Sequence, residues 1–122
     1  MSAFTNLCVF TLFVFLFFLL DEPRVLSQVN QPISRTINII GKASDPLTKM
    51  PFDPSPVNLP IGSTVMWINN DAVLHTVTSF TNSFDSGIIP PKGNFNYTFY
   101  ETGYYNYYCR LHPNMNGVIA IG

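Results

Sequence analysis

The residue types able to do chemistry in this 122-residue chain gather in one stretch near its carboxyl end. The run Cys109-Arg110-Leu111-His112-Pro113-Asn114-Met115 spaces a thiol, an imidazole and a thioether as C-x2-H-x2-M. Soft and borderline donors of this kind suit copper, whereas hard cations prefer oxygen ligands. The only other histidine of the sequence is His75. A mononuclear copper centre, with two His and one Cys in a trigonal plane and a long axial Met, would use all four residues.

Each of these residues has an ordinary interpretation when it is taken alone. A histidine on an apolar strand face, such as His75, is usually a hydrogen-bonded core residue. His112 alone would be a surface loop histidine, and Met115 alone a core side chain. Cys109 alone would be a small buried hydrophobe. The copper interpretation depends on their combination, because the only two histidines of the chain, Cys109 and a methionine fall at compatible positions. The other cysteine, Cys8, lies in the apolar stretch at the start of the chain.

The first residues of the chain predict export. From Leu7 to Leu20 every residue but Thr11 is apolar, a run of 14 residues. A spanning helix needs roughly 20 apolar residues, and the apolar part of a signal peptide roughly 7–15. Residues 1–27 are therefore predicted to be a signal peptide, with cleavage before Gln28, or else an N-terminal membrane anchor through residues 3–20. The body is expected in the periplasm, outside the cell or on the outer face of the cytoplasmic membrane.

The remaining residues, 28–122, are enough for one small domain, which we expect to be monomeric. Its charges balance, because five basic residues (Arg35, Lys42, Lys49, Lys92, Arg110) meet five acidic ones (Asp45, Asp53, Asp71, Asp85, Glu101). A domain without a basic face lacks the electrostatic basis for nucleic-acid binding.

Short stretches with alternating polarity, separated by turn residues, predict an antiparallel β-sandwich of about seven strands. The alternation places Val65 and Trp67 on one face of their strand. It places His75 beside Val77, and Cys109 beside Tyr107, on inward faces. The expected strands are 33–40, 57–59, 63–69, 73–80, 94–100, 104–109 and 118–121.

Three segments together resemble a type 1 (blue) copper protein of the plastocyanin/azurin group. They are Trp67–Asp71, His75–Ser79 and the pattern G-x-Y-x-Y-x-C-x2-H-P-x-M-x-G over Gly103–Gly117. The spacing of the ligand loop is most similar to that of amicyanin. The resemblance implies an all-β, Greek-key sandwich or barrel of about eight strands, with one metal site at one end.

The resemblance also implies a function and a set of roles. His75, Cys109 and His112 would be the strong ligands of one copper ion, and Met115 the weak axial ligand. The ion would alternate between Cu(I) and Cu(II), so that the protein shuttles single electrons with redox partner proteins that dock near His112. One position departs from the pattern: Thr76 stands where many relatives carry an Asn that ties the two ligand loops together.

Other functions fit the sequence less well. An immunoglobulin-like module would need a partner cysteine upstream of Trp67 in the body, and none is present. Copper enzymes need further histidine clusters, so we do not expect an enzyme. A copper carrier or storage protein without an electron-transfer role remains the alternative, because ligand identity alone does not exclude it.

Overall fold

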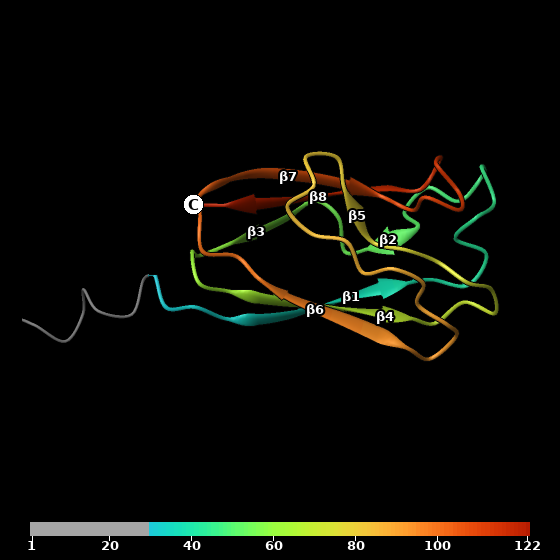
Figure 1. Cartoon of the computed structure of the whole chain (residues 1–122), viewed down its shortest axis with the longest axis horizontal. Helices are drawn as coiled ribbons and strands as arrows, with labels where there is room; N and C mark the ends of the chain where they lie inside the picture. The colour runs from blue at the N-terminus through green and yellow to red at the C-terminus, as the bar shows by residue number, and fades with distance from the viewer. Residues whose placement is uncertain (1–29) are drawn as a thin grey trace, which may run out of the picture. The chain divides into compact units, whose positions relative to one another are not determined.

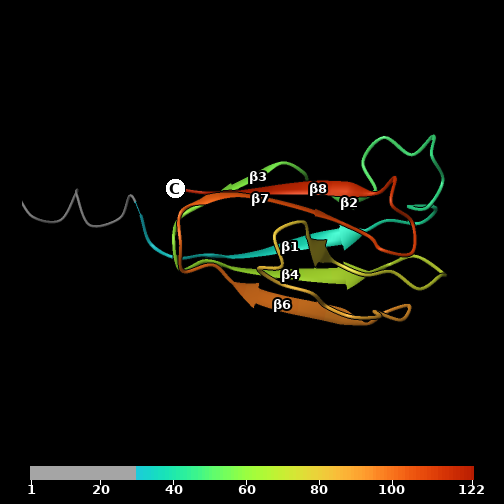
Figure 2. The same ribbon diagram turned by 45° about the horizontal axis from the view of Figure 1, so that its top comes forward.

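Two four-stranded β-sheets face each other across a shared apolar core (Figures 1 and 2). The computed structural model describes residues 30–122, and Pro32–Gly122 form one unit within them. The predicted all-β sandwich is confirmed. Its strands are β1 (Ser34–Ile39), β2 (Phe52–Asp53), β3 (Val57–Leu59), β4 (Thr64–Asn69), β5 (Thr78–Ser79), β6 (Asn94–Thr98), β7 (Gly103–Tyr108) and β8 (Asn116–Ile121).

The predicted leader, residues 1–27, lies outside the described residues. Within residues 30–122, no helix has the length and apolar character needed to span a membrane.

The first sheet has the strand order β2-β1-β4-β6. Strand β1 runs parallel to β4, with Ile37 opposite Trp67, and β6 runs antiparallel to β4, with Phe95 opposite Trp67. Val65 and Trp67 are fully buried, whereas the intervening Met66 is only partly so. This alternation matches the prediction, since successive side chains of a strand point to opposite faces.

The second sheet has the order β3-β8-β7-β5. The C-x2-H-x2-M segment, residues 109–115, joins two of its strands. Strands β7 and β8 pair antiparallel along their whole length, from Gly103 opposite Ile121 to Tyr108 opposite Asn116. The connection between them, residues 109–115, is therefore fixed at both ends by the ladder.

The prediction of a purely antiparallel sandwich is wrong, because β1 pairs parallel with β4 and β3 pairs parallel with β8. Between β1 and β4 the chain forms β2 and then crosses to the other sheet for β3. A chain that leaves a sheet and returns in this way can enter beside its earlier strand in the same direction, which a tight hairpin does not allow.

The predicted strand 73–80 is also wrong, because only Thr78 and Ser79 form a strand there. The buried Asn69 amide donates to the carbonyl oxygens of Val73 (2.8 Å) and Ile89 (3.0 Å). A side chain therefore holds the Val73 carbonyl at the start of the predicted strand, and residues 70–77 form a loop. His75 keeps one isolated bridge, to Ile89.

Strand β2 was not expected, since Phe52 and Asp53 lie between prolines in a stretch that reads as a loop. Residues 94–98 form β6, slightly shorter than predicted, and β8 begins two residues earlier than predicted.

Aromatic rings pack between the two sheets, and their contacts with Tyr107 determine which side of β7 faces the core. Tyr107 is fully buried, with its ring centroid 5.5 Å from that of Trp67 and 4.8 Å from that of Phe52. Cys109 follows two residues later on the same inward side and is fully buried as well. The connection 109–115, the segment 70–75 and the long connection 40–51 lie at the end of the sandwich away from the C-terminus (Figure 1).

Candidate metal centre

The connection 109–115 is a compact loop held by its own backbone. Cys109 N–H donates to the Met115 carbonyl (3.1 Å), His112 N–H to the Cys109 carbonyl (3.3 Å) and Met115 N–H to the His112 carbonyl (2.9 Å). These bonds bring the three possible ligands of the loop close to one another along the chain. Met115 is fully buried, and His112 is partly exposed.

His75 reaches the same place from the loop that follows β4. Its side chain is fully buried, and its backbone exchanges hydrogen bonds with Ile89 at 3.3 and 2.8 Å. The sequence placed His75 on a strand; the structure instead gives it a single bridge at the edge of the site.

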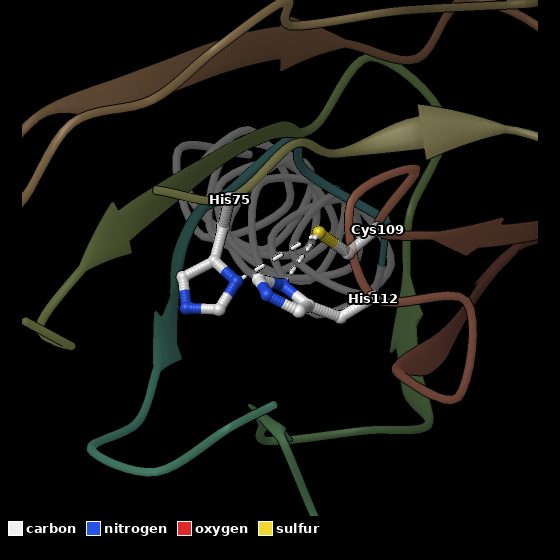
Figure 3. Close-up of side chains that lie close together, drawn as sticks. All are labelled: His75, Cys109 and His112. Carbon is white, nitrogen blue, oxygen red and sulfur yellow. Dashed lines mark hydrogen bonds between the residues drawn. The ribbon is translucent and has the colours of Figure 1, made fainter. Parts of the chain in front are cut away.

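The three side chains meet around the Cys109 sulfur (Figure 3). Cys109 Sγ lies 3.7 Å from His75 Nδ1 and 3.6 Å from His112 Nδ1. All three ligand atoms lie within 4.8 Å of one another. Figure 3 shows the two imidazoles reaching toward the sulfur from separate segments of the chain.

These separations suit one metal ion bound to all three donors. First-row ions such as zinc bind imidazole nitrogen at about 2.0 Å and thiolate sulfur at about 2.3 Å. In a trigonal plane, such bonds would put the nitrogen and the sulfur about 3.7 Å apart. The observed 3.6 and 3.7 Å agree with that value. Two imidazoles and one thiolate are also the donors typical of a trigonal copper site.

A carboxylate that sequence analysis did not assign to the site orients His75. Asp71 Oδ2 lies 2.8 Å from His75 Nε2, and the Asp71 side chain is only 8 % exposed. Backbone N–H groups of Ala72 (2.8 Å) and Lys42 (3.1 Å) donate to Asp71 Oδ1. Because a carboxylate only accepts, it keeps the proton of the neutral imidazole on Nε2, which leaves Nδ1, the nitrogen that faces Cys109, to bind a metal ion.

The sequence places a carboxylate near His75, because Asp71 stands only four residues before it. The run Asn69-Asn70-Asp71 reads as a turn from its composition, however. Asn69 Oδ1 accepts the Asp71 N–H at 2.9 Å, so two buried polar side chains build this loop.

Thr76 still ties the two ligand segments together, although it replaces the Asn of many relatives. Its N–H donates to Cys109 Sγ at 3.3 Å, and its Oγ1 accepts the N–H of Arg110 at 2.8 Å. The tie therefore uses both the backbone and the hydroxyl of the same residue.

The hydrogen bonds of the site set its protonation. Burial by itself would raise the pKa of the Cys109 thiol, but bonds with His75, the Thr76 N–H and His112 outweigh burial and lower this pKa to about 6. Burial would likewise raise the pKa of Asp71, yet its bonds with His75, Ala72 and Lys42 hold that pKa below its ordinary value. Burial would lower the pKa of His75, but its bonds with Cys109 and Asp71 outweigh burial and raise this pKa. In the metal-free protein the Cys109 thiolate can therefore accept a hydrogen bond from His75 Nδ1, and a bound metal ion would take the place of that proton.

Comparison with known proteins identifies the family of this chain. A family model of copper-binding proteins, the plastocyanin/azurin family, matches residues 41–122. The chain belongs to this family. Amicyanins of Paracoccus denitrificans and Paracoccus versutus are each 28 % identical to it over 80 residues, which cover 62 % of this chain and 61 % of theirs. The chain thus spans about three fifths of the length of these amicyanins.

Solved structures show the same fold. A purple cupredoxin from Nitrosopumilus maritimus has a TM-score of 0.67 and 29 % identity, over 72 % of this chain and 99 % of that one. A Cu(I) amicyanin variant has a TM-score of 0.59 and 25 % identity, over 73 % and 82 % of the two chains. This protein is thus a copper-binding cupredoxin close to amicyanin.

The Asp71 carboxylate is expected to support copper binding by this cupredoxin. Replacing it in Asp71→Asn lets an amide N–H face His75 Nε2, which favours the tautomer protonated on Nδ1. We expect copper affinity to fall by about 10- to 100-fold, as for other groups that orient a metal-bound histidine. The measurement is a competition titration against a chelator of known affinity.

Asp53→Asn is the matched control, because Asp53 is an exposed carboxylate of β2. Its affinity should equal that of the wild type. Equal affinity in Asp71→Asn and the wild type would contradict the role of Asp71.

The metal-free protein should ionise Cys109 well below the ordinary range of thiols. Far-ultraviolet thiolate absorbance is expected to titrate with a midpoint near pH 6, against an ordinary pKa of 9.0. Since the folded-state pKa is the lower one, the ionisation contributes stability that is complete above the unfolded pKa and is lost as pH falls through about 6.

Cys109→Ser identifies the signal, because it should remove this transition. A midpoint that stays near the ordinary value in the folded protein would show that the hydrogen bonds to the sulfur do not outweigh its burial.

Proposed function

We propose that this protein is an exported blue copper protein that shuttles single electrons through one mononuclear site. In this proposal His75, Cys109 and His112 are the equatorial ligands and Met115 is the axial one. The observation that carries the proposal is the spacing of one sulfur and two nitrogen atoms, each contributed by a side chain held in place by the fold.

The burial of two of the proposed ligands, and the backbone hydrogen bonds that hold their segments, favour electron transfer over copper delivery. Cys109 and His75 are fully buried, and each belongs to a segment fixed by backbone hydrogen bonds. A carrier has to release its ion, which favours exposed and exchangeable ligands. A site whose donors already stand at bonding separations also needs little movement when a copper ion gains or loses an electron.

His112 offers the route to a partner, since it is the partly exposed member of the three. Apolar side chains next to the site segments are exposed by 44–53 %: Val73, Leu74, Ile88 and Leu111. We call these four residues the apolar rim. A domain with balanced charge gains little from long-range steering, so contact through the apolar rim is the docking mode that we propose for redox partner proteins.

A non-catalytic role fits the composition of the site. The sequence has only two histidines, and both belong to the three-donor group, so none is left for a second metal. When bound, copper supplies a one-electron couple, Cu(I)/Cu(II). The chain's own residues hold the donors, keep water from His75 and Cys109, and leave an edge of His112 accessible.

Export completes the proposal. The apolar run over residues 7–20 predicts it, because its length is that of the apolar part of a signal peptide. In this proposal residues 1–27 are a cleaved signal peptide or, as the alternative, a membrane tether through residues 3–20, and the copper-binding domain is monomeric.

Redox cycling with retention of the ion distinguishes a shuttle from a carrier. The reduced, copper-loaded protein is mixed with a small one-electron oxidant in the presence of an excess of Cu(I) chelator. We expect complete oxidation with the copper still bound, because the buried donors do not exchange on that time scale. The measurement is stopped-flow absorbance, with voltammetry of the same sample.

Met115→Leu tests the axial assignment in the same assay. It should retain copper and the redox cycle but show a higher reduction potential, since a thioether donor stabilises Cu(II) more than a hydrocarbon does. Transfer of copper to the chelator before oxidation would favour the carrier alternative.

A further inference from the structure

A series of hydrogen bonds links the backbone N–H of Arg110, the residue after Cys109, to the side chain of the same arginine through Thr76, Thr78 and Asp85. Arg110 N–H donates to Thr76 Oγ1 (2.8 Å), which lies 3.0 Å from Thr78 Oγ1. Thr78 Oγ1 donates to Asp85 Oδ1 (3.4 Å), and Arg110 Nη2 donates to that same oxygen (3.3 Å). We call Thr76, Thr78 and Asp85 the hydroxyl relay.

The groups at the two ends of the hydroxyl relay, the Arg110 N–H and the Asp85 carboxylate, determine which group donates each hydrogen bond between them. A backbone N–H can only donate and a carboxylate can only accept. Thr78 has a single hydroxyl proton, and it is used toward Asp85. The bond between the two threonines must therefore be donated by Thr76. This leaves a lone pair of Thr76 Oγ1 for the Arg110 N–H.

Burial enforces this order. Thr76 and Thr78 are 1 % and 6 % exposed, so their hydroxyls have little access to water as a substitute partner. Asp85 and Arg110 are about half exposed, and an ion pair of that kind contributes little by itself. The Asp85 carboxylate is also held by the Gly87 N–H at 2.9 Å. Its contribution is therefore to orient the two buried hydroxyls.

We propose that the hydroxyl relay positions the Thr76 N–H against the Cys109 sulfur and thereby sets the reduction potential of the copper site. Thr76 is held on both sides: its N–H donates to Sγ, and its hydroxyl holds the residue that follows Cys109. An N–H···S bond withdraws charge from the sulfur, which favours Cu(I) and raises the potential. This inference rests on the proposed copper ligands, and Thr76, Thr78 and Asp85 are positioning residues in it.

The test compares variants of equal size. Thr76→Val and Thr78→Val each remove one hydroxyl without a change in charge or volume, and Thr76→Ser keeps the hydroxyl. Thr98→Val is the matched control, because it breaks a 2.7 Å hydroxyl pair with Thr64 in the other sheet. Two quantities are measured: the reduction potential of the copper-loaded protein, and the hydrogen exchange of the Arg110 amide in the metal-free protein.

We expect Thr76→Val to lower the potential and to speed exchange of the Arg110 amide. Thr78→Val should change both in the same direction, whereas Thr76→Ser and Thr98→Val should match the wild type. A wild-type potential in Thr76→Val would overturn the inference. So would a wild-type potential and exchange rate in Thr78→Val, since the effect would then not pass through the relay.

The colour of the copper-loaded wild type separates this inference from the proposed function. If the wild-type protein showed no thiolate–copper colour, the ligand assignment would fail whatever the variants did. If the wild type were blue and the variants had unchanged potentials, only the hydroxyl relay would fail.

Discussion

The site depends on holding two imidazole nitrogens and one sulfur closer together than independent side chains would stay. Burial removes water from the imidazoles and the thiolate, and ordering each side chain costs conformational entropy. Strand pairing, core packing and hydrogen bonds of neighbouring residues offset this cost by holding the three donors in place. The β7–β8 ladder fixes both ends of the ligand loop, and the core rings around Tyr107 direct Cys109 inward. On the other side, the buried Asn69 amide and the Asp71 carboxylate fix the loop that carries His75.

Two residues of the His75 loop hydrogen-bond to different ligands of the proposed site. Asp71 acts on the far nitrogen of His75 and so determines which nitrogen faces the sulfur. Thr76 acts on the sulfur itself through its N–H. Both groups lie in the same short loop region, which explains why that region has almost no regular strand. Its backbone and side chains serve the site instead of a β-ladder.

The sequence was informative where one local pattern decides the outcome. Alternation predicted the inward faces of β4 and β7, and the spacing from Cys109 to Met115 predicted a ligand loop between the last two strands. It was uninformative where a side chain competes with the ladder, as at Asn69, whose amide holds the carbonyl of Val73 at the start of the predicted strand 73–80. The parallel pairings of β1 with β4 and of β3 with β8 depend on crossovers between the sheets, which no short pattern encodes. Asp71 was missed because an acidic residue in a polar turn looks like any solvated loop residue until its burial is known.

The central claim is that His75, Cys109 and His112 together bind one copper ion with a short thiolate bond. The most direct measurement is the visible absorption and electron paramagnetic resonance of the protein after addition of one equivalent of Cu(II). The account predicts an intense thiolate-to-copper absorption band with a narrow copper hyperfine splitting, and the loss of both in Cys109→Ser. A pale protein with ordinary cupric splitting, unchanged by Cys109→Ser, would contradict it.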